Sequence, residues 1–360
     1  SCSEMRKTLI LAILVVLPLT FHGCDKNGTT VELPPPVKPD DKDKGGDSGN
    51  TGGETNPWDA NRGKVVTPSG ANWTSKTIDD GVVYYTFDGK DDISGVKQQV
   101  FVIDLDLSKT QYTVKLVETN PRKVTSEAFK LEDGTIAAMN ANYEPGSIYI
   151  RVNATLISNL PNSTIGDTGV PNWKSEAAFS TDRKQGVKIF FVGSQKKGEM
   201  TVAQQRSYFG TVSSITAPDL ISSAPMLIDD YKLVGDSFCD FSLSLDQAKK
   251  LNSEHPDNHQ RVRHPRSAVA LTENNHFIML VVDGRTNYSL GMSAQELTDF
   301  FVKNFNPQYA LNMDGGGSSC MCVKGEGDSS THVVNYPCDN SKHDHAGERS
   351  RDIHFVIVKK

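Results

Sequence analysis

The chain has 360 residues and a formal net charge of −6, so it is long enough for one large domain or two small ones and is only mildly acidic. Its Lys and Arg residues form no block and no aromatic-flanked stripe that could follow a phosphate backbone. Nucleic acid is therefore excluded as the expected partner.

The N-terminal segment has the pattern of an export signal. Arg6 and Lys7 precede an apolar run from Leu9 to Leu19, which is shorter than the roughly 20 residues that span a bilayer and suits a signal-peptide core. Gly23 precedes Cys24 as in a loose bacterial lipobox. We expect residues 1–24 to be a signal peptide and Cys24 to carry a lipid, with an ordinary secretory signal as the alternative. The predicted location is the bacterial cell envelope, with membrane contact only through this anchor.

Residues 25–57 are rich in Pro, Gly, Lys, Asp, Thr and Ser. This composition has too little apolar surface to offset the entropy of ordering. We predict a disordered tether between the anchor and the folded body.

Export also affects the interpretation of Cys239, Cys320, Cys322 and Cys338. An oxidising compartment favours disulfides, and four cysteines allow three pairings. Cys320 and Cys322 directly follow a glycine-rich segment, so bridges are expected to pin it. The alternative is a metal site that combines the cysteines with His332, His343 and His345. The spacing of these residues matches no standard zinc motif, so we predict neither a metal nor a cofactor.

The folded body begins near residue 58 with alternating apolar and polar segments at 82–87, 99–107 and 111–118, which are typical of half-buried antiparallel strands. We predict a strand-rich N-terminal subdomain over 58–124 and a main domain over 125–360. The fold class is α+β, with mixed, largely antiparallel sheets and packed helices.

Later elements follow in order along the main domain. Strands are expected at 135–142, 187–192, 223–228 and 353–358, and a strand pair at 268–271 and 277–282 turns at Asn274-Asn275. Residues 161–180 are rich in turn formers and predict a long loop over the site. A helical pattern occupies 240–255, and the capping box of Ser293 and Glu296 opens a second helix.

The segment from Ala310 to Ser319 is the strongest functional signal. A strand-like approach delivers Asp314 onto three consecutive glycines and then a pair of hydroxyl groups, and glycines without a Cβ can fold tightly enough to aim backbone N–H groups at one point. An ordinary turn is the alternative, and the segment fits neither a nucleophile elbow nor a P-loop. The candidate residues here are Asp314, Gly315, Gly316, Gly317 and Ser318.

Further candidates lie at the ends of other predicted strands. Asn140 and Asn142 could bind sugar hydroxyls or only shape a turn. Arg266 and Arg285 have the planar fork that suits phosphate, with an exposed salt bridge as the alternative for Arg285. The remaining charged candidates are Asp283, Glu348 and Arg349.

Several of these segments, taken in chain order, resemble the phosphodiester glycosidase family over about the last two thirds of the chain. The resemblance rests on the Asn140 segment and on six further stretches: 224–227, 265–269, 282–285, 291–297, 310–319 and 348–350. It implies cleavage of a sugar C1–O bond whose leaving group is a phosphate monoester, as in a GlcNAc-1-phosphate linkage. A phosphate leaves as a stable anion, so such a site needs cations at the phosphate and a carboxylate at the anomeric carbon more than it needs an acid.

On this resemblance, Asp314 is expected on the sugar side as nucleophile, base or hydroxyl anchor, with Glu348 as the second carboxylate and Asp283 in reserve. Arg266, Arg285, the glycine loop, Ser318 and Arg349 are expected to bind substrate. The partner is a phosphorylated glycan or sugar-1-phosphodiester, and the pattern predicts no oligomeric state. Two other functions remain open: a surface lipoprotein that binds phosphorylated glycans without cutting them, and a metal-dependent phosphodiesterase that cuts P–O.

Overall fold

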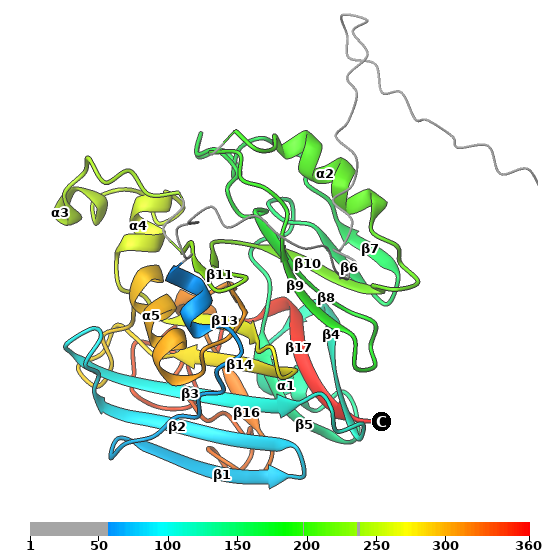
Figure 1. Ribbon diagram of the computed structural model, residues 1–360, viewed down its shortest axis with the longest axis vertical. Coiled ribbons are helices and arrows are strands. Elements are labelled where there is room, and N and C mark those ends of the chain that lie inside the picture. Colours follow the sequence, from blue (N-terminus) through cyan, green and yellow to red (C-terminus); the bar gives the residue numbers. More distant parts are fainter. Residues whose placement is uncertain (1–56, 197, 236–237) are drawn as a thin grey trace, which may run out of the picture. The chain divides into compact units, whose positions relative to one another are not determined.

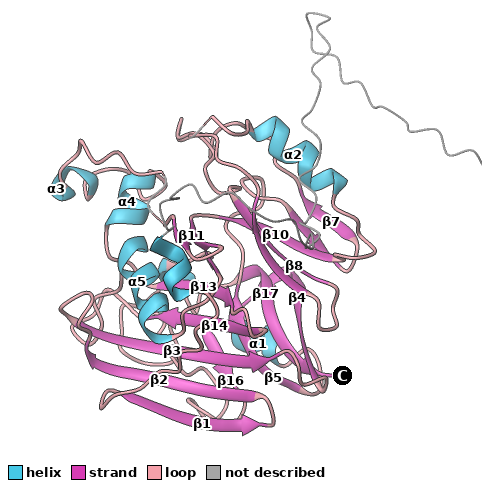
Figure 2. Cartoon of the chain, viewed as in Figure 1, coloured by secondary structure: helices cyan, strands magenta, loops and turns pink. Residues whose placement is uncertain are grey.

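Antiparallel β-sheets form the framework of the protein (Figures 1 and 2). The computed structural model describes residues 57–360 except 197 and 236–237, and Thr55–Lys360 form one compact unit. The predicted signal peptide and all but the last residue of the predicted tether lie outside the described residues.

The largest sheet has eight strands, which come from the start and from later parts of the described chain up to Asn312. Its strands β1 to β3, predicted as a separate subdomain, are hydrogen-bonded through β14 to the rest of the sheet. In order across the sheet the strands are β1 (Trp73–Asp79), β2 (Val82–Lys90), β3 (Lys97–Asp106), β14 (His276–Val282), β13 (Arg266–Leu271), β15 (Tyr309–Asn312), β11 (Met226–Asp229) and β12 (Lys232–Leu233).

Two smaller sheets complete the framework. The four-stranded sheet runs β16 (Met321–Val323), β5 (Thr135–Asn140), β17 (Arg351–Lys359) and β4 (Tyr112–Lys123). The five-stranded sheet runs β7 (Thr155–Ser158), β6 (Ile150–Val152), β10 (Asp219–Ser223), β8 (Ala177–Thr181) and β9 (Val187–Phe191). Every pairing between these strands is antiparallel, which confirms the predicted sheet-rich, largely antiparallel fold.

Strand β3 shows how the sequence pattern serves two cores. Phe101, Ile103 and Leu105 face the main core, which lies between the sheets. Val100 and Val102 face a second core beneath helix α5. Because successive side chains of a strand point to opposite faces, the strand is buried on both sides, more deeply than the half-buried strand that the alternation predicts.

Helices are few and short in the described chain (Figure 2). Helix α5 (Ala294–Asn304) begins with the predicted capping box and buries Leu297, Phe300 and Phe301 on the large sheet. The predicted helix over 240–255 is instead a single turn, α3, followed by α4, because the chain bends before the proline that opens α4. None of the described helices is long and apolar enough to cross a membrane. The others are η1 (Pro57–Asn61), α1 (Thr125–Phe129), α2 (Val202–Thr211), α3 (Leu245–Ala248), α4 (Pro256–Arg261) and η2 (Gly316–Ser318).

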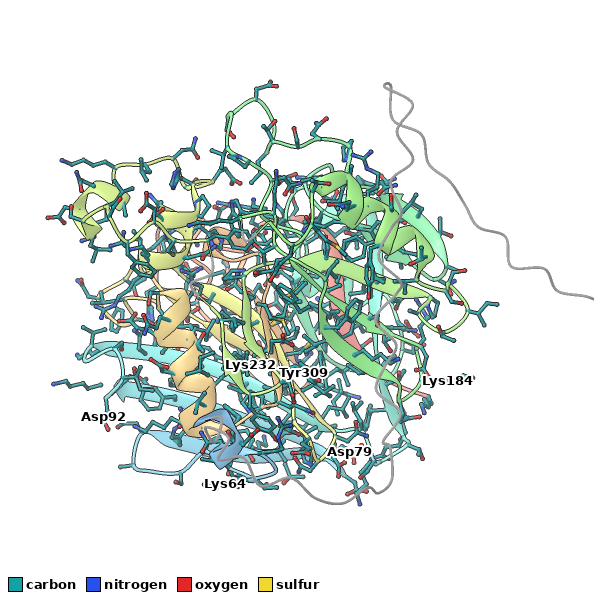
Figure 3. The ribbon with its side chains drawn as sticks, turned by 45° about the horizontal axis from the view of Figure 1, so that its top comes forward. Lys64, Asp79, Asp92, Lys184, Lys232 and Tyr309 are labelled. Atoms are coloured by element: carbon teal, nitrogen blue, oxygen red, sulfur yellow. The ribbon has the colours of Figure 1, made fainter. Side chains whose placement is uncertain are left out.

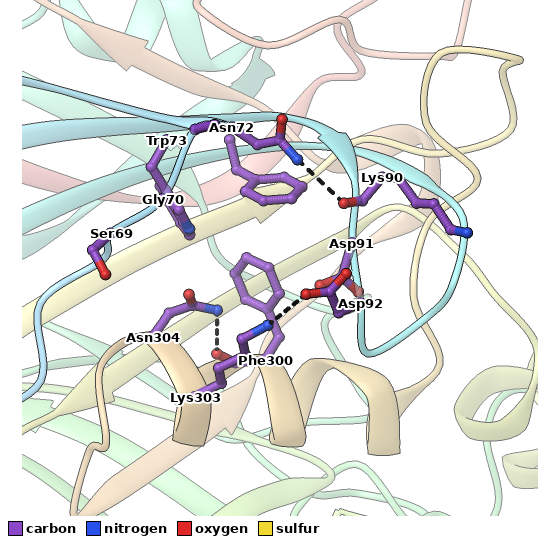
Figure 4. A pocket seen from close by; sticks show the side chains of 12 residues that line it. Ser69, Gly70, Asn72, Trp73, Lys90, Asp91, Asp92, Phe300, Lys303 and Asn304 are labelled. Atoms are coloured by element: carbon purple, nitrogen blue, oxygen red, sulfur yellow. Dashed lines mark hydrogen bonds and ion pairs between the residues drawn. The ribbon is translucent and has the colours of Figure 1, made fainter.

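A hollow of about 160 Å³ lies between α5 and the first hairpin (Figure 4). Trp73, Phe87 and Phe300 line it, and at its rim Lys303 pairs with Asp92 at 3.4 Å. None of the candidate site residues lines this hollow. The charged side chains of Lys64, Asp92 and Lys184, which are labelled in Figure 3, are exposed to solvent.

The strand registers bring the site segments together. Arg266 at the start of β13 pairs with Val282 at the end of β14, and Ala268 pairs with Asn312 at the end of β15. In the four-stranded sheet, His354 near the start of β17 pairs with Asn140 at the end of β5. The polar residues that follow or precede these strand ends therefore gather at common sheet edges.

Candidate active site

The glycine loop is held between the ends of two other strands. Backbone N–H groups of Asp314 and Gly316 donate to the carbonyls of Ala141 and Pro265, at 3.3 and 2.9 Å. A Cβ on Gly315 would lie 2.7 Å from the Pro265 carbonyl oxygen, and Gly316 has a φ of +61°. Glycine is required at both positions, by close approach at the first and by backbone conformation at the second.

The backbone of Asp314 is held by a hydrogen bond, and its carboxylate is nearly buried. Asn140 Nδ2 donates to the Asp314 carbonyl at 2.7 Å. The carboxylate is 16% exposed and faces Arg351, with Nε to Oδ2 at 3.2 Å in an ion contact whose geometry is not that of a hydrogen bond. Burial raises the pKa of Asp314, and the Arg351 cation opposes this effect. Arg351 therefore favours the ionised form of this carboxylate, whereas burial favours the protonated form.

Four buried polar atoms in this loop region have no hydrogen-bond partner among the described residues. They are Oδ2 of Asp314, Oγ of Ser318, Oγ of Ser319 and Nε of Arg351. Buried polar atoms in folded proteins are nearly always hydrogen-bonded, since an unmade bond costs about 1–3 kcal/mol. A cluster of such atoms at one loop is typical of a site that completes its hydrogen bonds with a ligand.

Two guanidinium groups cover the loop itself. Nη2 of Arg285 would lie 3.2 Å from a Cβ placed on Gly316, and the Arg349 guanidinium packs in the same way against Gly317. Arg349 is paired with Asp339. Arg285 is exposed, and its guanidinium lies 3.5 Å from His264 Nδ1 and interacts with the Cys338 thiol, but no carboxylate of the described residues pairs with it. Arg285 is thus the loop cation that remains available to an anion.

Lys174 adds a cation from the predicted loop over 161–180. Its side chain is 5% exposed, pairs with Glu254 at 2.5 Å, and lies 4.3 Å from the centre of the Tyr143 ring. It also lowers the pKa of Asp314, though less than Arg351 does. Together with Arg285, these residues surround one carboxylate with an excess of positive charge.

Arg266 lies deeper than Arg285. Its backbone adjoins the glycine loop, with Cα 3.5 Å from a Cβ placed on Gly315. The guanidinium donates to the backbone carbonyls of Met292 at 2.8 Å and Val262 at 3.1 Å, and no carboxylate of the described chain pairs with it. Burial lowers the pKa of Arg266 to about 10. Arg266 organises the backbone beside the loop and adds to its positive potential.

Asn140 and Asn142 use their side chains within the protein. Oδ1 of Asn140 accepts from the Ser267 hydroxyl at 2.8 Å, while its Nδ2 holds Asp314. Asn142 bridges the backbone of Ile353 at 2.8 Å and the carboxylate of Asp352 at 2.9 Å. Both amides are fully buried. They fix the strand ends that carry Asp314 and Arg351.

Asp283 and Glu348 are also directed to protein partners. Asp283 accepts from Nδ2 of Asn335 and from the Tyr336 N–H, both at 2.9 Å, and burial raises its pKa to about 7. Glu348 accepts from the N–H of Ser126 at 2.9 Å and from the Cys320 thiol at 3.2 Å. The structure therefore groups Asp314 with Arg285, Arg349 and the loop, and it gives Asp283 and Glu348 separate contacts.

The structure corrects the disulfide prediction for the four described cysteines. None of the four forms a disulfide: Cys239, Cys320 and Cys322 are buried and Cys338 is partly exposed. Cys320 and Cys322 lie two residues apart on an extended segment, where Cα atoms are about 6.7 Å apart, near the upper limit for a disulfide. Hydrogen bonds from Asn140, rather than bridges, hold the loop.

Arg351, Lys174 and His259 were not predicted as site residues. Arg351 and Arg349 alternate at the entrance of the last strand, a spacing that could have placed both at one edge. Lys174 and His259 have no such sequence signal. Burial lowers the pKa of His259 well below its usual range, so the ring is neutral.

His259 belongs to a buried polar chain that ends near Asp314. The Tyr143 hydroxyl donates to the Ala224 carbonyl at 2.8 Å and accepts from Nδ2 of Asn312 at 2.9 Å. His259 Nε2 lies 3.2 Å from the same hydroxyl. Because the phenol proton is already used, we infer that Nε2 carries the ring proton and that Nδ1, which has no partner in the described chain, is an open acceptor.

An apolar hollow of about 450 Å³ adjoins this chain through Trp173. The indole lines the hollow together with Phe238 and Leu243, and its ring centre is 4.6 Å from that of His259. The region next to the site therefore offers aromatic surface as well as charge.

A nearly buried carboxylate that faces a cation, further cations nearby and buried hydroxyl groups on a glycine loop are typical of an enzyme site. The sequence model of one family, Phosphodiester glycosidase, matches residues 133–358. The chain belongs to this family, and it is a hydrolase of the phosphodiester glycosidase type.

Solved structures add a comparison of fold. The catalytic domain of zebrafish N-acetylglucosamine-1-phosphodiester alpha-N-acetylglucosaminidase, auto-inhibited by its pro-peptide, is similar with a TM-score of 0.52 and 18% identity over 82% of this chain and 87% of that chain. A hypothetical protein from Synechocystis gives a TM-score of 0.49 and 11% identity over 81% of this chain and 64% of that chain. No curated protein sequence matches the chain. At these identities the likeness concerns the fold, and of these two structures the zebrafish domain, with the higher TM-score, is the one that supports it.

Proposed function

We propose that this hydrolase cleaves a sugar-1-phosphodiester of the GlcNAc-1-phosphate type at the C1–O bond. The observation that carries the proposal is the nearly buried Asp314 carboxylate, which faces Arg351 at 3.2 Å beside buried hydroxyl groups, with the exposed Arg285 over the same loop. Membership of the phosphodiester glycosidase family supports this reaction class.

Two kinds of group are needed for this reaction. As the C1–O bond breaks, its electron pair stays on the phosphate oxygen and positive charge develops at C1. Arg285 and the Ser318 hydroxyl are assigned to the phosphate, and Asp314 to the developing charge at C1. Water supplies the new C1–O bond, and its proton is released to Asp314 or to solvent.

The contacts of the two other predicted carboxylates fit this chemistry. Ordinary glycosides leave as poor alkoxides and require a second carboxyl group as acid. Glu348 and Asp283 contact protein groups instead. A phosphate monoester leaves without protonation, so Asp314 together with the cations is sufficient. We therefore retain Asp314 as the catalytic carboxylate and assign Asp283 and Glu348 supporting roles.

The test follows the oxygen of the attacking water. Wild-type protein is incubated with a GlcNAc-1-phosphodiester in water enriched in heavy oxygen, and the products are analysed by mass spectrometry. C1–O cleavage puts the label in free GlcNAc, and P–O cleavage puts it in a phosphate group. We expect labelled free sugar, and we expect Asp314→Asn to lower kcat/KM by about a hundredfold or more. The matched control Asp230→Asn removes an exposed carboxylate that pairs with Arg62.

Other outcomes separate the competing functions. Heat of binding without any product would identify a glycan-binding protein, and a labelled phosphate would identify a phosphodiesterase. Wild-type activity in a folded Asp314→Asn protein would remove Asp314 from the mechanism.

For location, we propose a lipoprotein of the bacterial cell envelope, tethered through residues 25–57 and anchored at Cys24. The pattern of an apolar run followed by Gly23 and Cys24 supports this. Full-length chain expressed in a bacterium should fractionate with membranes and incorporate labelled fatty acid. Cys24→Ser should abolish the label, and labelling of that variant would contradict the anchor.

A further inference from the structure

Two thiols and one carboxylate meet directly behind the glycine loop. Ligand atoms of Cys320, Cys322 and Glu348 all lie within 4.8 Å of one another, and the Cys320 Sγ is 3.2 Å from the nearer Glu348 oxygen. The cysteines alternate along the segment that enters β16, so their side chains share one face. Glu348 comes from the segment that precedes β17.

The surroundings of this cluster make a bound cation favourable. Both cysteines have no exposed surface and belong to an apolar cluster with Phe129, Val333 and Val356. Among the described residues Glu348 forms no ion pair, and it accepts hydrogen bonds from Ser126 and from the Cys320 thiol. A negative charge in such surroundings is costly without a counter-cation.

We propose that Cys320, Cys322 and Glu348 bind one Zn²⁺ ion. In a tetrahedral site with Zn–S bonds of about 2.3 Å, neighbouring ligand atoms are about 3.8 Å apart, which the observed spacing reaches with small side-chain movements. Two soft thiolates favour Zn²⁺ over Mg²⁺, Ca²⁺ or Mn²⁺. Binding forms two Zn–S bonds and one Zn–O bond and releases the two thiol protons to solvent. The fourth position is left for water.

The ion would stabilise the residues that hold the glycine loop, and it would not contact the substrate. The Cys320 N–H donates to Oδ1 of Asn140 at 3.1 Å, and Nδ2 of the same amide holds the Asp314 carbonyl. On the other side, Glu348 adjoins Arg349, which packs on Gly317. Zinc would thereby fix the exit of the loop, the role that disulfides were expected to have. This inference does not depend on the proposed reaction.

The experiment measures metal in the full-length, reduced protein. After equilibration with Zn²⁺ and removal of excess, elemental analysis should give about one zinc per chain. Replacement by Co²⁺ should produce a thiolate-to-cobalt charge-transfer band. Cys322→Ala and Glu348→Gln should lose most of the bound zinc and weaken the band. The matched control Cys239→Ala, which removes a buried thiol in another cluster, should keep both.

A chelator gives a second readout that does not require the variants to fold. It should lower the Tm of wild-type protein by several degrees, and added Zn²⁺ should restore it. Wild-type protein without bound zinc or a cobalt–thiolate band would overturn the proposal. So would a Cys320–Cys322 disulfide, detected as a mass lower by two hydrogens that reductant restores, if no metal binds after reduction.

Discussion

Replacement of Arg351 by methionine removes the cation that faces Asp314 while it keeps the length of the side chain. The two charged atoms are 3.2 Å apart, and the side chains are only 5% and 16% exposed. At an effective dielectric constant of about 20, two unit charges at this distance attract by about 5 kcal/mol. Lys174 and Arg349 remain in the variant and water enters the space, so we take about half of this energy, which raises the pKa of Asp314 by roughly 2 pH units.

The assay is the pH dependence of kcat/KM on a sugar-1-phosphodiester. In Arg351→Met the acid limb should move to higher pH by roughly 2 units, so activity below it falls about tenfold per pH unit. Arg351→Lys keeps a cation at this position and should therefore show a smaller shift of the acid limb than Arg351→Met. Arg122→Met is the matched control, because Arg122 pairs with Glu144 and Asp352 in the adjoining network and not with Asp314.

Folding is checked by circular dichroism and Tm, since Arg351 also contacts Glu144 at 2.8 Å. A folded Arg351→Met protein with the wild-type acid limb would refute the reasoning. Either Asp314 would not be the group that titrates, or Arg351 would not be what keeps it ionised.

Three further predictions concern stability and substrate binding. Burial raises the pKa of Asp283 to about 7, so the folded state holds this proton more tightly than the unfolded state. The free energy of unfolding of the wild type should therefore fall by up to about 4 kcal/mol as the pH rises from about 4 to about 7. Urea titrations should not find this loss in Asp283→Asn. Gly315→Ala should cost about 1–3 kcal/mol of unfolding free energy and lower kcat/KM, because its Cβ would lie 2.7 Å from the Pro265 carbonyl oxygen. Arg285→Gly removes the guanidinium over Gly316, and glycine adopts the φ of +62° at this position without strain, so Tm should change little. Because a hydrogen bond to a charged group contributes about 1.5–3 kcal/mol, kcat/KM should fall about 10- to 100-fold.

The two variants Gly315→Ala and Arg285→Gly have matched controls within the chain. Gly210→Ala, in open space on α2, should be neutral or slightly stabilising. Lys303→Ala removes an exposed cation that pairs with Asp92 beside a hollow that no candidate site residue lines, and it should leave kcat/KM unchanged. The same pH slope in Asp283→Asn as in wild type, wild-type stability in Gly315→Ala, or wild-type kcat/KM in Arg285→Gly would contradict the corresponding prediction.

Local pattern was sufficient for much of the fold. The pair of strands β13 and β14, with its turn at Asn275, follows from alternating apolar residues and a residue that adopts positive φ. The capping box of Ser293 and the buried face of α5 follow from the helical period. The pattern did not reveal that β1 to β3 join the large sheet, because hydrogen bonding between strands distant in sequence leaves no local signal.

For this protein, the sequence by itself determined the strands, the family and the glycine loop that carries Asp314, because these depend on residue type and spacing along the chain. Only the tertiary structure decided which groups meet that carboxylate. It brought Arg351 and Arg285 to the loop, and it turned Asp283, Glu348, Asn140 and Asn142 to protein partners. The physical reason is that charge pairing and hydrogen bonding act over a few ångströms in space, and strand register sets which residues lie within that distance.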